Sequence, residues 1–287
     1  MEILRPDTLA DALAMKAAHP GARPIAGGTD LMVELNFDRS RPEEIIDLAR
    51  VPELREHGRE NGALRIGAGV SYTRLIGELG DRLPGLAIAS RTVGSPQIRN
   101  RGTVGGNLGT SSPAGDGLPP LFASDAVVEV ASAARGARRV PVAEFVTGPK
   151  RNALRDDELI VAFHLAPAGG PQQFAKIGTR NAMVIAVCSL SVHLWPRERA
   201  VTACIGSAGP TPIRAREAEA FVVGELDWES RAPLGAAAVS EFGALVERAA
   251  RPIDDVRGTA AYRHHALGVL ARRTLTWTWN EYRGETA

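Results

Sequence analysis

The sequence of 287 residues contains little cysteine and carries almost no net charge. Its two cysteines, Cys188 and Cys204, cannot supply the four thiolates that hold a typical iron–sulfur cluster. Both lie in apolar stretches, which predicts buried, unpaired thiols in a reducing compartment and therefore a cytoplasmic protein. The formal net charge of +1 gives no electrostatic reason to expect nucleic acid or an anionic membrane as a partner.

Several common motifs are also absent. No apolar run is long enough to span a bilayer, and the N-terminal residues show no signal-peptide pattern. The six histidines are scattered and lack zinc-site spacing, so no metal ligand is expected. Neither G-x-G-x-x-G between a strand and a helix nor G-x-x-x-x-G-K-[ST] occurs. Ser111 and Ser112 lack the flanking residues of G-x-S-x-G, which disfavours a hydrolase.

The stretch from Gln97 to Asp116 is rich in glycine and short polar residues and is flanked closely by apolar segments. Loops of this length are usually either functional or disordered, and the apolar flanks favour order. Glycine allows a ligand to approach the main chain, and successive unpaired amides suit phosphate. We therefore expect an ordered loop whose amides face a ligand, with Asp116 accepting from a hydroxyl. A glycine-rich hairpin without a ligand is the alternative.

A second small-residue turn lies between Arg23 and Met32. A short apolar strand leads into Gly-Gly-Thr-Asp at 27–30, and an apolar run that can begin a helix follows. Amides exposed at the start of a helix favour an anion, because the helix dipole is positive there. Two such turns suit a diphosphate held between two loops rather than on one helix.

These segments carry a family resemblance when they are taken together. Ala26 to Leu31, Gln97 to Asn107 and Ser112 to Asp116 occur in this order, with further similarity at 176–186 and 252–263. They resemble the FAD-binding medium subunit of the molybdenum hydroxylases, the family of xanthine dehydrogenase and carbon monoxide dehydrogenase. The resemblance covers nearly the whole chain, and three motifs in the right order are more specific than either glycine loop alone.

The resemblance implies a set of FAD-binding residues and no catalytic residue. The backbone at 27–30 and 103–107 would meet the diphosphate. Asp116 would lie near the adenosine half, although it could also cap the helix that follows. Lys176 would lie near the pyrimidine side of the flavin, where an ammonium stabilises the anionic reduced form; the alternative is a strand lysine that reaches water. The implied residues are Ala26, Gly27, Gly28, Thr29, Asp30, Leu31, Thr103, Val104, Gly105, Gly106, Asn107, Ser112, Asp116 and Lys176.

The expected fold is α+β. A two-subdomain PCMH-type FAD-binding domain would comprise residues 1–55 and 56–170. A C-terminal domain of the CO dehydrogenase flavoprotein type would comprise 171–287, with a three-stranded antiparallel sheet and helices. Its predicted strands cover 173–177, 183–194 and 200–207, and its predicted helices cover 214–222, 234–249 and 257–279.

The resemblance also implies a function. The chain would be an FAD-binding electron-transfer subunit, active only with a molybdopterin-binding large subunit and a small subunit carrying two [2Fe–2S] clusters. Electrons would pass from the clusters through FAD to an external acceptor, in a dimer of heterotrimers. The sequence specifies neither the substrate nor the acceptor. A stand-alone flavin-dependent oxidase and a non-enzymatic module that has lost its cofactor are the alternatives; the first lacks a candidate base, and the intact glycine loops disfavour the second.

Overall fold

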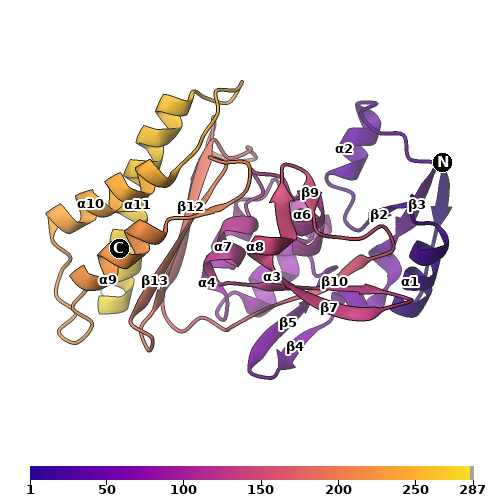
Figure 1. Cartoon of the computed structure of the whole chain (residues 1–287), viewed down its shortest axis with the longest axis horizontal. Helices are drawn as coiled ribbons and strands as arrows, with labels where there is room; N and C mark the ends of the chain where they lie inside the picture. The colour runs from indigo at the N-terminus through magenta and orange to yellow at the C-terminus, as the bar shows by residue number, and fades with distance from the viewer. Residues whose placement is uncertain (285–287) are drawn as a thin grey trace. The chain divides into compact units, whose positions relative to one another are not determined.

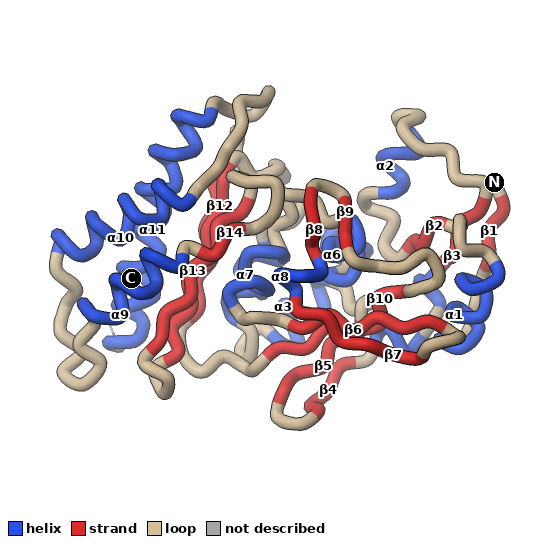
Figure 2. Tube along the Cα trace, in the orientation of Figure 1, coloured by secondary structure: helices blue, strands red, loops and turns tan. Residues whose placement is uncertain are grey.

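The computed structural model describes residues 1–284 and divides the chain into two compact units, each with its own sheets (Figures 1 and 2). Unit 1 comprises Met1–Leu75, Ser95–Ser111 and Asp125–Ala166. Unit 2 comprises Ile76–Gly94, Ser112–Ser124 and Pro167–Ala287. Two short segments from the first half of the sequence therefore belong with the C-terminal part. The finer division at residues 55 and 170 stays a prediction.

Unit 1 begins with a small parallel sheet of strand order β1-β3-β2. The sheet and its helix are β1 (Glu2–Leu4), α1 (Leu9–Ala18), β2 (Arg23–Ile25) and β3 (Glu44–Asp47). Helix α1 begins at Thr8, whose hydroxyl accepts a hydrogen bond from the amide of Asp11. At its other end, the buried ammonium of Lys16 donates to the carbonyls of Pro20 and Ala22. These bonds fix the turn into β2, and the first glycine loop follows that strand directly.

The second sheet of unit 1 has five strands in the order β4-β5-β10-β6-β7, all antiparallel. Its central strand β10 is buried along its whole length, so the sheet is covered on both faces there. A hairpin joins β6 and β7, with Gly136 at positive φ. The strands are β4 (His57–Glu60), β5 (Ala63–Gly67), β6 (Val127–Ser132), β7 (Gly136–Pro141) and β10 (Leu159–Leu165).

Short helices and one small hairpin connect these strands (Figure 2). Helix α3 runs across the boundary between the two units. The remaining elements of this part of the chain are α2 (Leu31–Asn36), η1 (Leu48–Arg50), η2 (Pro52–Arg55), α3 (Tyr72–Leu79), α5 (Pro96–Arg101), α6 (Val104–Thr110), α8 (Val142–Phe145), β8 (Val146–Gly148) and β9 (Arg151–Asn152).

Unit 2 is built on a four-stranded antiparallel sheet of order β11-β12-β13-β14. The sequence predicts only three strands, and that prediction is wrong. The fourth strand consists of Ile213 and Arg214 alone, which is too short to show an alternating pattern, and the sequence places Arg214 in the following helix. The strands are β11 (Gln172–Ile177), β12 (Cys188–Trp195), β13 (Ala200–Gly206) and β14 (Ile213–Arg214).

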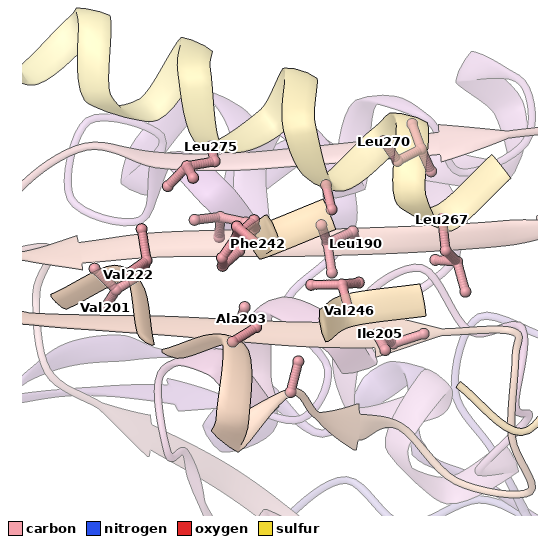
Figure 3. Close-up of a cluster of buried hydrophobic side chains, with 14 of the residues drawn as sticks. Leu190, Val201, Ala203, Ile205, Val222, Phe242, Val246, Leu267, Leu270 and Leu275 are labelled. Carbon is pink, nitrogen blue, oxygen red and sulfur yellow. The ribbon is translucent and has the colours of Figure 1, made fainter. Parts of the chain in front are cut away.

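The two faces of this sheet differ in polarity. Side chains such as Leu190, Ala203 and Phe242 form an apolar core between the sheet and three helices (Figure 3). Because side chains alternate along a strand, Ser191 and His193 lie on the opposite face, where α4 and α7 pack. The helices of unit 2 are α4 (Pro84–Arg91), α7 (Leu118–Ala123), α9 (Arg216–Glu225), α10 (Ala236–Ala249) and α11 (Ala260–Arg283).

The cysteines agree with the sequence prediction. Cys188 and Cys204 are buried and form no disulfide. Burial raises the pKa of the Cys188 thiol to about 12, so this thiol stays protonated and unreactive at neutral pH. Among the described residues 1–284, no helix combines the length and apolar character needed to cross a membrane.

Candidate functional site: two glycine-bearing turns and a buried carboxylate

The polar stretch from Gln97 to Asp116 is ordered, as predicted, but it is not one long loop. It contains helices α5 and α6, each of which begins at a capping residue. The Ser95 hydroxyl accepts from the amide of Ile98, and Pro96 occupies the first helical position. The prediction of a loop failed because glycine has a low helix propensity, whereas the caps favour helix at these positions.

Thr103 fixes the first turn of α6. Its side chain is buried, and its hydroxyl oxygen accepts from the amide of Gly106 at 2.9 Å. The amide of Gly105 donates to no acceptor within residues 1–284, whereas the amide of Val104 faces the carbonyl of Val70 across the antiparallel bridge between Ser71 and Thr103. The N–H groups in the first turn of a helix have no partners within the helix. A buried N–H group without a partner lowers the stability of the fold. The Gly105 amide is therefore available to an anion.

The first glycine turn lies between β2 and α2. Gly28 adopts a φ of +74°, a conformation that other residues rarely take. Its carbonyl accepts from the amide of Met32, which closes the turn. The amides of Gly28, Thr29 and Asp30 have no acceptor in the described part of the chain. This turn thus presents three successive donors.

The two turns contact each other inside unit 1. A Cβ atom built at Gly27 would overlap the carbonyl oxygen of Arg101, at the end of α5. The hydroxyl of Thr110, at the end of α6, donates to the Asp30 carboxylate at 3.2 Å. The structure therefore brings together the two segments that the sequence analysis predicts to share one diphosphate.

The glycines at these turns have different roles. A Cβ at Gly105 would overlap the carbonyl oxygen of Ala68 and lie 2.5 Å from its Cβ. Gly27 and Gly105 are thus required for close packing of the backbone. Gly106 is exposed, and its Cβ would approach only the hydroxyl oxygen of Thr103, at 3.1 Å. Gly106 keeps a surface clear beside the free amide of Gly105, which fits the close approach of a diphosphate.

We expect Gly105→Ala to destabilise the fold, whereas Gly106→Ala leaves it intact. The added methyl at 105 must displace the backbone around Ala68, and overpacking of this kind costs about 1–3 kcal/mol or more. Urea unfolding of the apo chain measures both free energies. Equal stability of the two variants would show that the packing at Gly105 is not as tight as the structure indicates.

Leu31 and Val104, by contrast, have buried side chains that belong to the packing of the unit. They can serve a ligand only through their backbone. Ala26 is half-buried at the end of β2, and Asn107 is half-buried within α6. Ser112 lies in unit 2, where its hydroxyl accepts from the amide of Ala114 at 3.3 Å and stabilises a local turn.

Lys176 and Asp116 form a buried ion pair in unit 2. Lys176 lies on β11, and its Nζ is 2.5 Å from Oδ2 of Asp116; each side chain is 9% exposed. Nζ also donates to the carbonyls of Thr92, at 3.0 Å, and Val184, at 3.1 Å. The expectation that Lys176 could simply reach water is therefore wrong. A contact with a flavin would require the exchange of one of these three bonds.

The two oxygens of Asp116 have unequal surroundings. Oδ2 accepts from Lys176 and from the hydroxyl of Thr92, at 3.2 Å. Oδ1 is buried and has no hydrogen-bond partner among the described residues. The capping alternative is wrong, because the N-cap of α7 is Gly117 and no side chain caps this helix. Burial raises the pKa of Asp116, while Lys176 acts in the opposite direction.

An unpaired buried carboxylate oxygen is costly, and a hydroxyl donor would relieve that cost. Oδ1 therefore fits the hydroxyl contact that the sequence analysis assigns to Asp116. Sequence reasoning missed Thr92, which supplies both its hydroxyl and its carbonyl to this cluster. No local pattern could have indicated Thr92, because its partners lie 24 and 84 residues away.

Comparison with known proteins assigns both parts of the chain to flavoprotein families. Residues 1–167 match the family model described as "FAD binding domain in molybdopterin dehydrogenase". Residues 173–278 match "CO dehydrogenase flavoprotein C-terminal domain". The two matches together define the FAD-binding part of a multi-subunit oxidoreductase.

Individual relatives match over almost their full length. The xanthine dehydrogenase FAD-binding subunit of Escherichia coli O157:H7 is 32% identical, over 95% of this chain and 94% of that protein. The carbon monoxide dehydrogenase medium chain of Afipia carboxidovorans is 30% identical, over 94% of each. Among solved structures, reconstituted CO dehydrogenase from Oligotropha carboxidovorans gives a TM-score of 0.89 at 28% identity, covering 97% of each chain. The chain belongs to the FAD-binding medium subunits of the molybdopterin hydroxylases, the family of xanthine dehydrogenase and carbon monoxide dehydrogenase.

Proposed function

We propose that this subunit holds FAD by its diphosphate at the two contacting turns and passes electrons from partner [2Fe–2S] clusters to an external acceptor. The observation that carries the proposal is the set of unpaired amides in two segments that touch each other. Three belong to residues 28–30, and the fourth is the amide of Gly105 at the start of α6. Bound FAD would supply the redox centre, since no amino-acid side chain can exchange electrons in the same way.

The chain's own residues bind and orient the diphosphate. Successive amides form a concave donor site that stabilises negative charge without a nearby cation. Thr103 holds the first turn of α6 in place, and Gly106 leaves room for the phosphate oxygens. In unit 2, the assignment of Asp116 Oδ1 to a hydroxyl of the cofactor stays a prediction, which the unpaired state of that oxygen supports.

The proposal assigns the other redox centres to partner subunits. Two cysteines cannot hold a [2Fe–2S] cluster with four thiolates, and residues 1–284 contain no group of three histidine, cysteine or carboxylate side chains placed to bind a metal. A large molybdopterin-binding subunit and a small [2Fe–2S] subunit would complete the complex as a dimer of heterotrimers. The name of the Afipia relative, a medium chain, supports a multi-subunit complex.

Cofactor content tests the first half of the proposal. The purified chain should show the absorbance of an oxidised flavin, and denaturation should release FAD in an amount equal to the protein. A colourless chain that also fails to take up added FAD would contradict the assignment and favour a module that has lost its cofactor.

Electron transfer tests the second half. We expect dithionite-reduced small subunit, freed of excess dithionite, to bleach the flavin absorbance of this chain within the assembled complex. A small subunit stripped of its clusters is the control and should have no effect. Oxygen consumption by the isolated chain with an added organic substrate would instead support a stand-alone oxidase.

A further inference from the structure

The buried ion pair in unit 2 connects three segments that are distant in sequence. Lys176 on β11 binds the carbonyl of Thr92 at the end of α4, the carboxylate of Asp116 before α7, and the carbonyl of Val184 between β11 and β12. An ammonium has three N–H donors, and these three acceptors use all of them. Lys176 therefore has no donor left for a ligand.

The same contacts determine which carboxylate oxygen of Asp116 is left without a hydrogen-bond partner. Lys176 binds Oδ2, and the Thr92 hydroxyl, which also donates to the carbonyl of Ala89 at 2.7 Å, lies 3.2 Å from the same oxygen, so rotation of the Asp116 side chain is restricted. Oδ1 is left buried and unpaired. Without the Lys176 ammonium, the Asp116 carboxylate could rotate and exchange the positions of its two oxygens. The buried carboxylate would also lose the positive charge that pairs with it.

We propose that Lys176 is a positioning residue for the cofactor site: it holds Asp116 so that Oδ1 is presented to a hydroxyl donor, and it acts through Asp116 rather than by touching the flavin. This inference rests on the proposed function of the chain as an FAD carrier. It differs from the role that the family resemblance implies for Lys176, which is a direct contact on the pyrimidine side of the flavin.

A double-mutant cycle separates the two roles. The dissociation constant of FAD is measured for the apo chain, Lys176→Met, Asp116→Asn and the double variant. Loss of a hydrogen bond to a charged group should weaken binding about 10- to 100-fold in each single variant. If Lys176 acts through Asp116, the affinity of the double variant for FAD equals or exceeds that of the single variant that binds FAD less tightly. If Lys176 touches the flavin, the two losses multiply, and the inference is overturned.

The reduction potential of the bound FAD gives a second readout. An ammonium against the flavin would favour the reduced form, so its removal would lower the potential. Under our proposal the potential of Lys176→Met stays equal to that of the unaltered chain. Arg180→Met is the control, because among residues 1–284 the Arg180 guanidinium binds the carbonyls of Ala182 and Met183 in its own segment. This control should change neither the affinity nor the potential.

The double-mutant cycle still tests the inference if one single variant does not fold. If Lys176→Met alone does not fold, the double variant, which removes both charges, is compared with Asp116→Asn. Equal FAD affinity of these two supports the inference, and weaker binding by the double variant overturns it. Failure of the unaltered chain to bind FAD would instead contradict the proposed function itself.

Discussion

Replacing Gly106 by valine should empty the FAD site while the fold remains intact. Gly106 is exposed at the start of α6, beside the free amide of Gly105. A Cβ here meets only the hydroxyl oxygen of Thr103, at 3.1 Å, so a small shift of that side chain makes room for it. Under the proposed function, the same side chain would occupy the space that the diphosphate needs. We expect the affinity for FAD to fall by at least about 100-fold, which corresponds to roughly 2.7 kcal/mol.

The matched control for this experiment is Gly224→Val. Gly224 is an exposed glycine of α9, and a Cβ there meets nothing within 4 Å. Both variants place the same β-branched side chain on a helix surface, so their effects on stability should be similar. FAD content after purification and titration with added FAD measure the outcome. If Gly106→Val retains a full complement of FAD, the diphosphate does not lie at the start of α6.

Sequence reasoning identified the two segments that carry the unpaired amides but not the different packing of their glycines. Gly105 and Gly106 are adjacent and look equivalent in the sequence. The difference arises from Ala68, which lies against Gly105 and leaves Gly106 open. Such a contact joins residues far apart in the chain, and no local pattern encodes it. The side-chain polarity of β12, in contrast, follows a simple alternation that the sequence shows directly.

Asp116 and Lys176 illustrate the same limit. Each was identified through its own motif, with a separate role at the cofactor. Their direct ion pair spans 60 residues and depends on how β11 and the segment before α7 fold together. Because of that pairing, one carboxylate oxygen of Asp116 has hydrogen-bond partners and the other has none. This difference exists only in the folded unit, and it means that a substitution of Lys176 should act through Asp116.

The polar face of the unit 2 sheet contains a histidine that makes stability depend on pH. His193 is fully buried, and its ring nitrogens lie 3.2 Å from the Ser124 hydroxyl and 2.9 Å from the Ser191 hydroxyl. Burial, assisted by the positive charge of Arg214, lowers the pKa of His193 from 6.5 to about 3. The native state therefore keeps this imidazole neutral in mildly acidic solution, whereas the unfolded chain protonates it.

The consequence for stability has a definite sign. Between about pH 6.5 and pH 3 the unfolded state binds one more proton at this site than the native state. The free energy of unfolding therefore falls as the pH is lowered, by about 1.4 kcal/mol per pH unit or roughly 2 kcal/mol at about pH 5. Above the unfolded pKa, His193 contributes no pH dependence. Full protonation of the native site is reached only below the folded pKa.

We expect His193→Gln to remove this part of the acid sensitivity. Glutamine can still hydrogen-bond to the two serine hydroxyls but does not titrate. Urea unfolding near neutral pH and at about pH 5 measures how much the free energy of unfolding of each variant falls on acidification. His265→Gln is the control, because His265 is exposed on α11 and should leave the loss unchanged. If His193→Gln loses as much stability on acidification as the unaltered chain, the acid sensitivity originates in groups other than this buried imidazole.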